Sequence, residues 1–191
     1  MEQDMKLFYN IAFEAIEKED LELRRLFTKT PNNEKLYNDE HRGICCLYET
    51  TFVYQIFKAL MENNYKYRVV WEHPYICNSN WHSDLALQEV RGEDKITKAL
   101  IEFKIWNTES SNAIQKDVKK LREEKEIKNK YIFVIEYGGK LEDKLKNDIS
   151  GIKLLPKCKR SFTTQYRYGK ENKENKKNID ENQINVYMYK V

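Results

Sequence analysis

The segment YIFVIEY at residues 131–137 is almost entirely apolar or aromatic. A strand with one face in water would alternate apolar and polar residues, and this segment does not. It is therefore typical of a central strand that is covered on both faces. Helices supply such covering layers, so we expect an α/β fold in which a central mixed β-sheet is flanked by helices.

The rest of the chain alternates helical and extended patterns. Apolar residues recur at helical spacing in two early segments, and period-two or β-branched residues follow in three more. The predicted elements are helix 5–27 (one helix or two short ones), helix 41–63 with the stripe Cys45, Tyr48, Phe52, Ile56, Ala59 and Leu60, strand 67–71 (ending before Pro74), strands 84–90 and 96–106, a helix after 110–112, and strand 131–137. In the last helix, Ile114, Val118 and Leu121 are expected to face inward. The turn at 91–95 indicates that the second and third strands form an antiparallel hairpin.

The pattern is weaker beyond Gly151. Residues 157–169 mix basic and aromatic side chains, and residues 170–182 are a low-complexity Lys, Asn and Glu segment that we expect to be a mobile loop. Residues 183–189 alternate as a last strand would. We expect residues 1–191 to form one domain, with its core at about residues 41–137.

Charge and cysteine content limit the class of protein. The formal net charge is only +3, from 34 basic and 31 acidic residues, so nucleic-acid binding would need a local basic patch. The four cysteines have no CxxC spacing and indicate neither a zinc site nor a disulfide framework. The sequence shows neither a signal peptide nor a membrane span, so we expect a cytoplasmic protein with no membrane partner.

Two charges interrupt the third predicted strand. Glu102 and Lys104 stand between the apolar segments 99–101 and 105–106. Charges among apolar neighbours in mid-strand are costly unless they are paired or bind a ligand. Period-two geometry puts Glu102 and Lys104 on one face of the strand and Phe103 on the other.

Asp84 is predicted to lie opposite Glu102. If the hairpin turns about Glu93, each acid is nine positions from the turn, and the two face each other across the strands. Directly opposed carboxylates repel each other, and a bound divalent cation would convert that repulsion into coordination. Glu49 is a candidate third acid, because helical spacing puts it within the apolar stripe of its helix.

Asp84, the Glu102-Phe103-Lys104 motif and the preceding helix with Glu49 resemble the PD-(D/E)xK nuclease superfamily, which has the restriction-endonuclease-like fold. The predicted element order is similar to the αβββαβ core of that fold, and the stretch DVKKL at 117–121 is similar to many members. The resemblance covers roughly residues 44–137. Ser83 stands at the position of the proline after which the superfamily is named.

The resemblance implies a Mg²⁺- or Mn²⁺-dependent nuclease that hydrolyses phosphodiester bonds, with DNA expected rather than RNA. By position, Asp84, Glu102 and the main-chain carbonyl of Phe103 would bind the metal. Glu49 would hold a second metal or a metal-bound water. Lys104 would orient the nucleophile or stabilise developing negative charge.

Further residues are candidates for nucleic-acid contacts. Gln88 shares the face of Asp84 and is expected to line the groove. Basic residues near the C-terminus are interleaved with aromatic ones, and could contact phosphates and stack on unpaired bases. These basic residues are Lys157, Lys159, Arg160 and Arg167. The alternative for them is a solvated basic loop.

Less specific interpretations stay open. Glu102 and Lys104 could form a salt bridge on a half-exposed edge strand, and Asp84 could simply begin a strand. Glu49 could be a half-buried helical residue that is paired to Lys or Arg. For the whole protein, the alternatives are a catalytically inactive nucleic-acid-binding or assembly module, and a defence-associated or regulatory partner subunit. A homodimer, or a site completed by a partner, is also left open.

Overall fold

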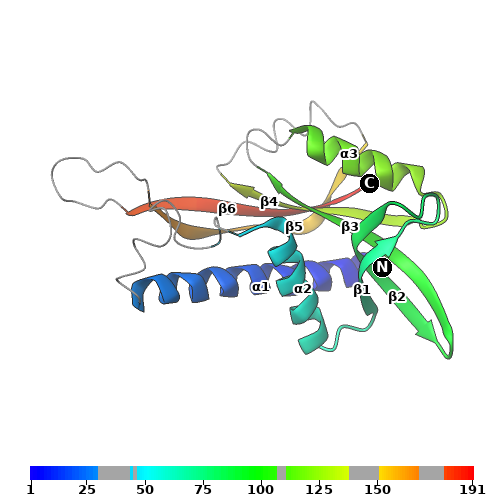
Figure 1. The fold of residues 1–191 in the computed structure, drawn as a ribbon, viewed down its shortest axis with the longest axis horizontal. Coiled ribbons are helices and arrows are strands. Elements are labelled where there is room, and N and C mark those ends of the chain that lie inside the picture. Colours follow the sequence, from blue (N-terminus) through cyan, green and yellow to red (C-terminus); the bar gives the residue numbers. More distant parts are fainter. Residues whose placement is uncertain (30–43, 45–46, 107–110, 138–150, 168–178) are drawn as a thin grey trace.

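The computed structural model of the chain describes residues 1–29, 44, 47–106, 111–137, 151–167 and 179–191. These residues form helices packed on one β-sheet (Figure 1). The elements are α1 (Glu2–Lys29), α2 (Glu49–Glu62), β1 (Arg68–Pro74), β2 (His82–Arg91), β3 (Asp94–Trp106), α3 (Ser111–Glu123), β4 (Asn129–Tyr137), β5 (Lys153–Arg167) and β6 (Ile179–Lys190).

The six strands of the described residues form one mixed sheet in the order β1-β2-β3-β4-β6-β5. β3 and β4 run parallel, and the other neighbouring pairs are antiparallel. Parallel neighbours need a crossover connection, and α3 lies between β3 and β4 in the chain. The predicted α/β class with a central mixed sheet is therefore confirmed.

Helices lie on both faces of the sheet, with α1 and α2 on one side and α3 on the other (Figure 1). Odd-numbered residues of β3, such as Ile101 and Phe103, join the core formed with α1 and α2. The even-numbered Leu100 packs on the other side, against Leu121 of α3. This alternation directs the even-numbered Glu102 and Lys104 to the α3 side.

The central segment behaves as its composition predicts. β4 lies between β3 and β6, and residues 131–136 of β4 are all buried. The inward face of α3 is also as predicted, because Ile114, Val118 and Leu121 are each at most 2% exposed.

The start of the second helix is a correction. The helix begins at Glu49, because Tyr48 has an extended backbone (φ −83°, ψ 157°). Tyr48 is also exposed rather than part of the apolar stripe. Ile44 is held instead by a 3.0 Å hydrogen bond from its backbone N–H to Asp20 of α1. Cys45, another predicted member of the stripe, lies outside the described residues.

One other boundary also differs from prediction. Of the two possibilities left open for the first helical segment, the structure has one continuous helix, α1. β1 extends to Pro74, although a strand was expected to end before it. Proline lacks a backbone donor, and β1 tolerates it because it lies at the edge of the sheet.

The basic C-terminal segment is a strand rather than a loop. β5 pairs with β6 over most of its length, and Cys158, Phe162 and Thr164 alternate into the core. The pairing changes register between Leu154 and Lys159. Such an irregularity hides the period-two pattern from sequence inspection. The predicted last strand is confirmed as β6, but it begins at Ile179, inside the predicted loop.

Candidate active site

The hairpin of β2 and β3 closes with a two-residue turn. Arg91 pairs with Asp94, which leaves Gly92 and Glu93 at the tip. Gly92 has a φ of +62°, a backbone conformation that glycine adopts without steric cost. The turn is therefore centred between Gly92 and Glu93, half a residue before the centre assumed from the sequence.

A β-bulge changes the register further along the hairpin. Gln88 lies opposite Thr97, whereas the next residue, Leu87, lies opposite Ala99. Lys98 is thus an extra residue in β3. A bulge of this kind shifts all the following pairs by one position.

The shifted register aligns the two predicted acids. Leu85 pairs with Ile101, so Asp84 is the residue opposite Glu102. Without Lys98 the tight turn would place Asp84 opposite Ile101, and a slip of one residue reverses the face to which a side chain points. The predicted opposition of Asp84 and Glu102 is confirmed, and it depends on the bulge.

Where β2 and β3 separate, two side-chain carboxylates accept the backbone hydrogen bonds of β3 that β2 would otherwise accept. Beyond Ile101, the backbone N–H of Phe103 donates to Oδ2 of Asp84 at 2.7 Å. The N–H of Ile105 donates to Oε2 of Glu49 at 3.1 Å. Unpaired backbone donors are costly when buried, so these side chains stabilise the end of β3 as well as forming the site.

Both opposed carboxyl groups have a raised pKa. Burial raises the pKa of Glu102 to about 8, and the charge of Asp84 adds to the rise. Burial also raises the pKa of Asp84, against the lowering effect of the Phe103 hydrogen bond. A divalent cation between the two groups would favour their charged forms.

Lys104 lies between two acidic residues from different helices. Its ammonium is 3.0 Å from Oε1 of Glu49 and 3.0 Å from Oδ2 of Asp117. Burial acts to lower the pKa of Lys104, but the attraction of Asp117 and Glu49 outweighs it and raises the pKa overall. Lys104 is therefore a fixed positive charge beside the carboxylate pair.

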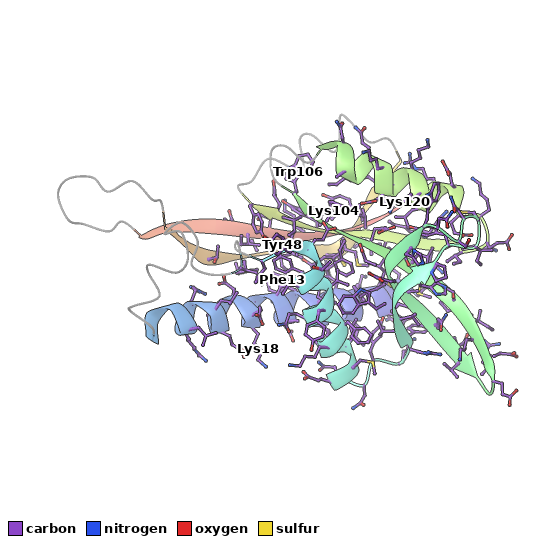
Figure 2. The ribbon with its side chains drawn as sticks, in the orientation of Figure 1. Phe13, Lys18, Tyr48, Lys104, Trp106 and Lys120 are labelled. Atoms are coloured by element: carbon purple, nitrogen blue, oxygen red, sulfur yellow. The ribbon has the colours of Figure 1, made fainter. Side chains whose placement is uncertain are left out.

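Lys120 of α3 is a second cation at the site. Its ammonium is 2.8 Å from Oδ1 of Asp117 and 3.2 Å from Oε1 of Glu102. Figure 2 shows Lys120 on α3 and Lys104 on β3. Asp117 thus joins the two lysines. The sequence alone assigned no role to Lys120. The available signal was its partner Asp117, an acid that falls three residues after Ile114, within the apolar stripe of α3.

Tyr75 completes the surroundings of Glu102. Its phenolic hydroxyl donates to Oε1 of Glu102 at 2.5 Å, and the ring is almost fully buried. Tyr75 follows β1 and comes near β3 only through the fold of the β1–β2 connection. Nothing in its local sequence distinguishes it, so it was missed.

Charge balance indicates what the site can hold. Four carboxyl groups and two ammonium groups are linked by the contacts above, which gives a formal charge of −2 when all are ionised. The members are Glu49, Asp84, Glu102, Asp117, Lys104 and Lys120. One divalent cation would neutralise this charge, and Mg²⁺ prefers carboxylate and carbonyl oxygens, commonly with only one or two protein carboxylates.

Another buried carboxylate in the chain has different partners. Glu124 accepts hydrogen bonds from the backbone N–H groups of Ile76, Cys77 and Glu126. Burial acts to raise the pKa of Glu124, but these bonds lower it overall. Glu124 is therefore a satisfied structural acid, whereas Glu102 faces another carboxylate.

Glu49 is not brought to the carboxylate pair. Both of its oxygens are used, one by Lys104 and one by Ile105. Among the residues that the structure describes, no three His, Cys, Asp or Glu side chains are grouped as a metal-binding cluster. The geometry matches the alternative of a helical acid paired to a lysine.

The salt-bridge alternative for the motif is met in part, because both charges are ion-paired, though with other residues in the described contacts. β3 is an interior strand rather than an edge strand. The ammonium that bridges to Glu102 is that of Lys120, whereas Lys104 pairs with Glu49 and Asp117.

The remaining predicted residues lie away from the carboxylate pair. Gln88 is buried near the bulge, and its amide donates to the hydroxyl of Thr97. β5, which carries the predicted basic residues, is at the sheet edge, separated from β3 by β4 and β6. Lys157, Lys159 and Arg160 are exposed, and the Arg167 side chain lies outside the description.

Two of the basic residues on β5 point to opposite faces of the sheet. The Lys159 ammonium lies 5.6 Å from the ring centre of Tyr187, which belongs to the core on the α3 side. The Arg160 guanidinium lies 3.8 Å from the ring centre of Phe13 in α1. They therefore do not form one patch with a common direction.

Comparisons with protein-family models, curated proteins and solved structures give no match. No helix of the described residues is long and apolar enough to cross a membrane.

Proposed function

We propose that the protein is a divalent-metal-dependent nuclease, with Mg²⁺ or Mn²⁺ held by Asp84 and Glu102. The observation that carries the proposal is that these two carboxylates lie opposite each other where the pairing of β2 and β3 ends. Lys104 lies on the same face of β3 as Glu102. Opposed carboxylates repel each other, and a cation bound between them would offset this repulsion.

The topology supports a restriction-endonuclease-like core. α2, β1, β2, β3, α3 and β4 follow one another in the order αβββαβ. The first three strands are antiparallel neighbours and β3 is parallel to β4. This is the order that the sequence resemblance implies, and Glu102 and Lys104 both contact side chains of α3.

A metal at this position would be held by the carboxylates of Asp84 and Glu102 and the main-chain carbonyl of Phe103. When bound, it would supply Lewis-acid activation of the phosphodiester and of the attacking water. Tyr75 holds Glu102 in place through its 2.5 Å hydrogen bond. The residues thus fit Mg²⁺ in donor type and in charge.

The lysines supply the remaining chemistry. An ammonium has three donors, and Lys104 directs two of them to Glu49 and Asp117. The third can donate to a phosphate oxygen and stabilise the negative charge that develops there. Lys120 gives a second positive charge next to Glu102. The expected reaction is hydrolysis of a phosphodiester bond, with DNA the expected substrate.

A cleavage assay tests this proposal. Labelled DNA and RNA are incubated with the wild type, with Lys104→Met and with Asp84→Asn, in Mg²⁺, in Mn²⁺ and in EDTA. We expect metal-dependent products from the wild type but not from Lys104→Met or Asp84→Asn. The surface variant Lys58→Met is the matched control, because Lys58 pairs only with the exposed Glu62 in the described contacts. Metal-independent products, or equal products from all variants, would refute the proposal.

The second candidate is a nucleic-acid-binding or assembly module without turnover. The observation that favours it is the double ion pair of Lys104, which already satisfies much of its charge within the protein. A binding module would retain nucleic acid while yielding no product in a single-turnover reaction with excess protein. Product formation under those conditions decides for the nuclease.

A further inference from the structure

The two most exposed large apolar side chains of the described residues are each next in sequence to a residue of the candidate site. Tyr48 is 82% exposed and Ile76 is 63% exposed. Tyr48 directly precedes Glu49, which bonds to Lys104 and Ile105. Ile76 directly follows Tyr75, which bonds to Glu102. Each of these apolar residues is thus next in sequence to a residue whose side chain contacts β3.

The fold gives no reason for a tyrosine at position 48. Tyr48 is the N-cap residue of α2 and makes no side-chain capping bond. Ser, Thr, Asp and Asn are the residues that stabilise a helix at this position. Figure 2 shows Tyr48 at the start of α2, close to the labelled Lys104 in this view. The ring therefore contributes neither a cap nor, at this exposure, core packing.

Another exposed tyrosine on the same helix is explained by packing. Tyr54 is 48% exposed, and its ring centre lies 5.9 Å from that of Trp71 on β1. Aromatic pairs at this separation stabilise each other. Tyr54 is thus a structural residue, and it offers a control for any role of Tyr48.

Position 48 directly precedes a residue that contacts the proposed phosphate-binding lysine. Glu49 contacts the same Lys104 ammonium that would approach the phosphate. Exposed aromatic rings beside a backbone-binding site are used to stack on bases, and this stacking tolerates any sequence. In the interior of a duplex both faces of a base are already stacked on neighbours, so a protein ring reaches a base face at least cost where the strand is unpaired.

We propose that Tyr48 stacks on an unpaired base of the strand bound at this site, with Ile76 as an apolar contact for the adjoining nucleotides. The substrate class is then single-stranded or locally unpaired nucleic acid, such as a flap or a frayed end, rather than continuous duplex. This inference rests on the proposed function of the same site, because it needs a nucleic-acid strand there.

Fluorescence of the base 2-aminopurine tests the inference without requiring turnover. Short single-stranded oligonucleotides and their blunt duplexes, each carrying this base, are titrated with the full-length protein in Ca²⁺ and in EDTA. The variants are Tyr48→Ala, Tyr48→Phe, Ile76→Ser and the control Tyr54→Ala. Stacking changes the fluorescence of the base, so the readout is specific to base contact. Melting temperatures establish that all variants are folded.

The expected result is tighter binding of the single strand than of the duplex, with a change in fluorescence. Tyr48→Ala should weaken single-strand binding about 10-fold, the equivalent of about 1.4 kcal/mol, and abolish the fluorescence change. Tyr48→Phe and Tyr54→Ala should behave as the wild type, because stacking needs the ring and not the hydroxyl. Ile76→Ser should weaken binding by a smaller factor.

Two results would overturn the inference. One is equal binding by Tyr48→Ala and wild type, and the other is no fluorescence change with any oligonucleotide, which would leave Tyr48 for a protein partner. The proposed function fails separately. Stacking without metal-dependent cleavage would refute the nuclease and retain the binding role of Tyr48, whereas cleavage without a Tyr48 effect would refute only this inference.

Discussion

Asp84 accepts a 2.7 Å hydrogen bond from the backbone N–H of Phe103, the residue between the two charged positions of the motif. The bond directs the Asp84 carboxylate to the strand that carries Glu102. It also satisfies a backbone donor that β2 no longer reaches, because the ladder of β2 and β3 ends at the pair of Leu85 and Ile101. One side chain thus serves both the fold and the candidate site.

This dual role predicts different outcomes for two substitutions of Asp84. Asp84→Asn keeps an oxygen that accepts the Phe103 N–H, so the protein should fold with near wild-type stability. Asp84→Ala leaves the donor unpaired, and we expect a loss of about 1–3 kcal/mol in the free energy of unfolding. Urea unfolding in EDTA measures both. Equal stability of the Ala and Asn variants would contradict a structural role for this bond.

Stability in the absence of metal should depend on the ionisation of Glu102. Its pKa is raised from an ordinary value of 4.5 to about 8 in the folded protein. The folded state therefore holds a proton that the unfolded state releases, and the favourable contribution present below the ordinary value is lost as the pH rises towards 8. We expect a loss of roughly 1 kcal/mol per pH unit over this window.

Glu102→Gln removes that titration and supplies the control for it. In EDTA, the variant should gain stability relative to the wild type as the pH rises from about 5 to about 8, with a constant difference above that. The exposed Glu62→Gln variant on α2 is the surface control. Parallel stability curves for Glu102→Gln and the wild type would show that Glu102 titrates normally.

Tyr75 should control the metal affinity of Glu102. Its hydroxyl stabilises the charged form of Glu102, so Tyr75→Phe should raise the pKa of this carboxyl further. A proton then competes better with the metal. We expect Mn²⁺ affinity to fall several-fold near pH 7 and to approach that of the wild type above about pH 9. A pH-independent loss of affinity would indicate a packing effect instead.

A substitution of Glu49 tests whether this residue positions Lys104 or binds the metal. Both of its oxygens are bound to β3, so Glu49→Gln should retain the bond from Ile105 while losing the charge beside Lys104. We expect the dissociation constant for Mn²⁺ to change by less than about threefold, because in the proposed site Asp84 and Glu102 hold the metal. Weakening by tenfold or more would show that Glu49 turns to the metal, as the sequence resemblance implies.

Much of the arrangement follows from spacing alone. The apolar segment 131–137 predicts a covered central strand, and the charges at Glu102 and Lys104 mark one face of β3. The opposition of Asp84 and Glu102 was predicted correctly, although the turn was assumed to be centred at Glu93. The extra residue Lys98 makes up the difference, and no local pattern announces a bulge.

The partners from other elements could not be predicted in the same way. Tyr75 and Lys120 reach Glu102 only because the β1–β2 connection and α3 pack over β3. The start of α2 was predicted too early, because Tyr48 continues the apolar spacing although its side chain is exposed. Contacts between distant segments depend on tertiary packing, whereas periodicity reports only the local structure.

The most direct test of the central claim is calorimetric titration of Mn²⁺ into the wild type and into Asp84→Asn, at a pH of about 8 where Glu102 is partly ionised. One binding site in the wild type, absent from the folded variant, is the predicted result. Proton release on binding, measured as a dependence of the heat on buffer, should accompany it. No binding by the wild type, even with a single-stranded oligonucleotide present, would leave Asp84 and Glu102 as structural acids and contradict the account.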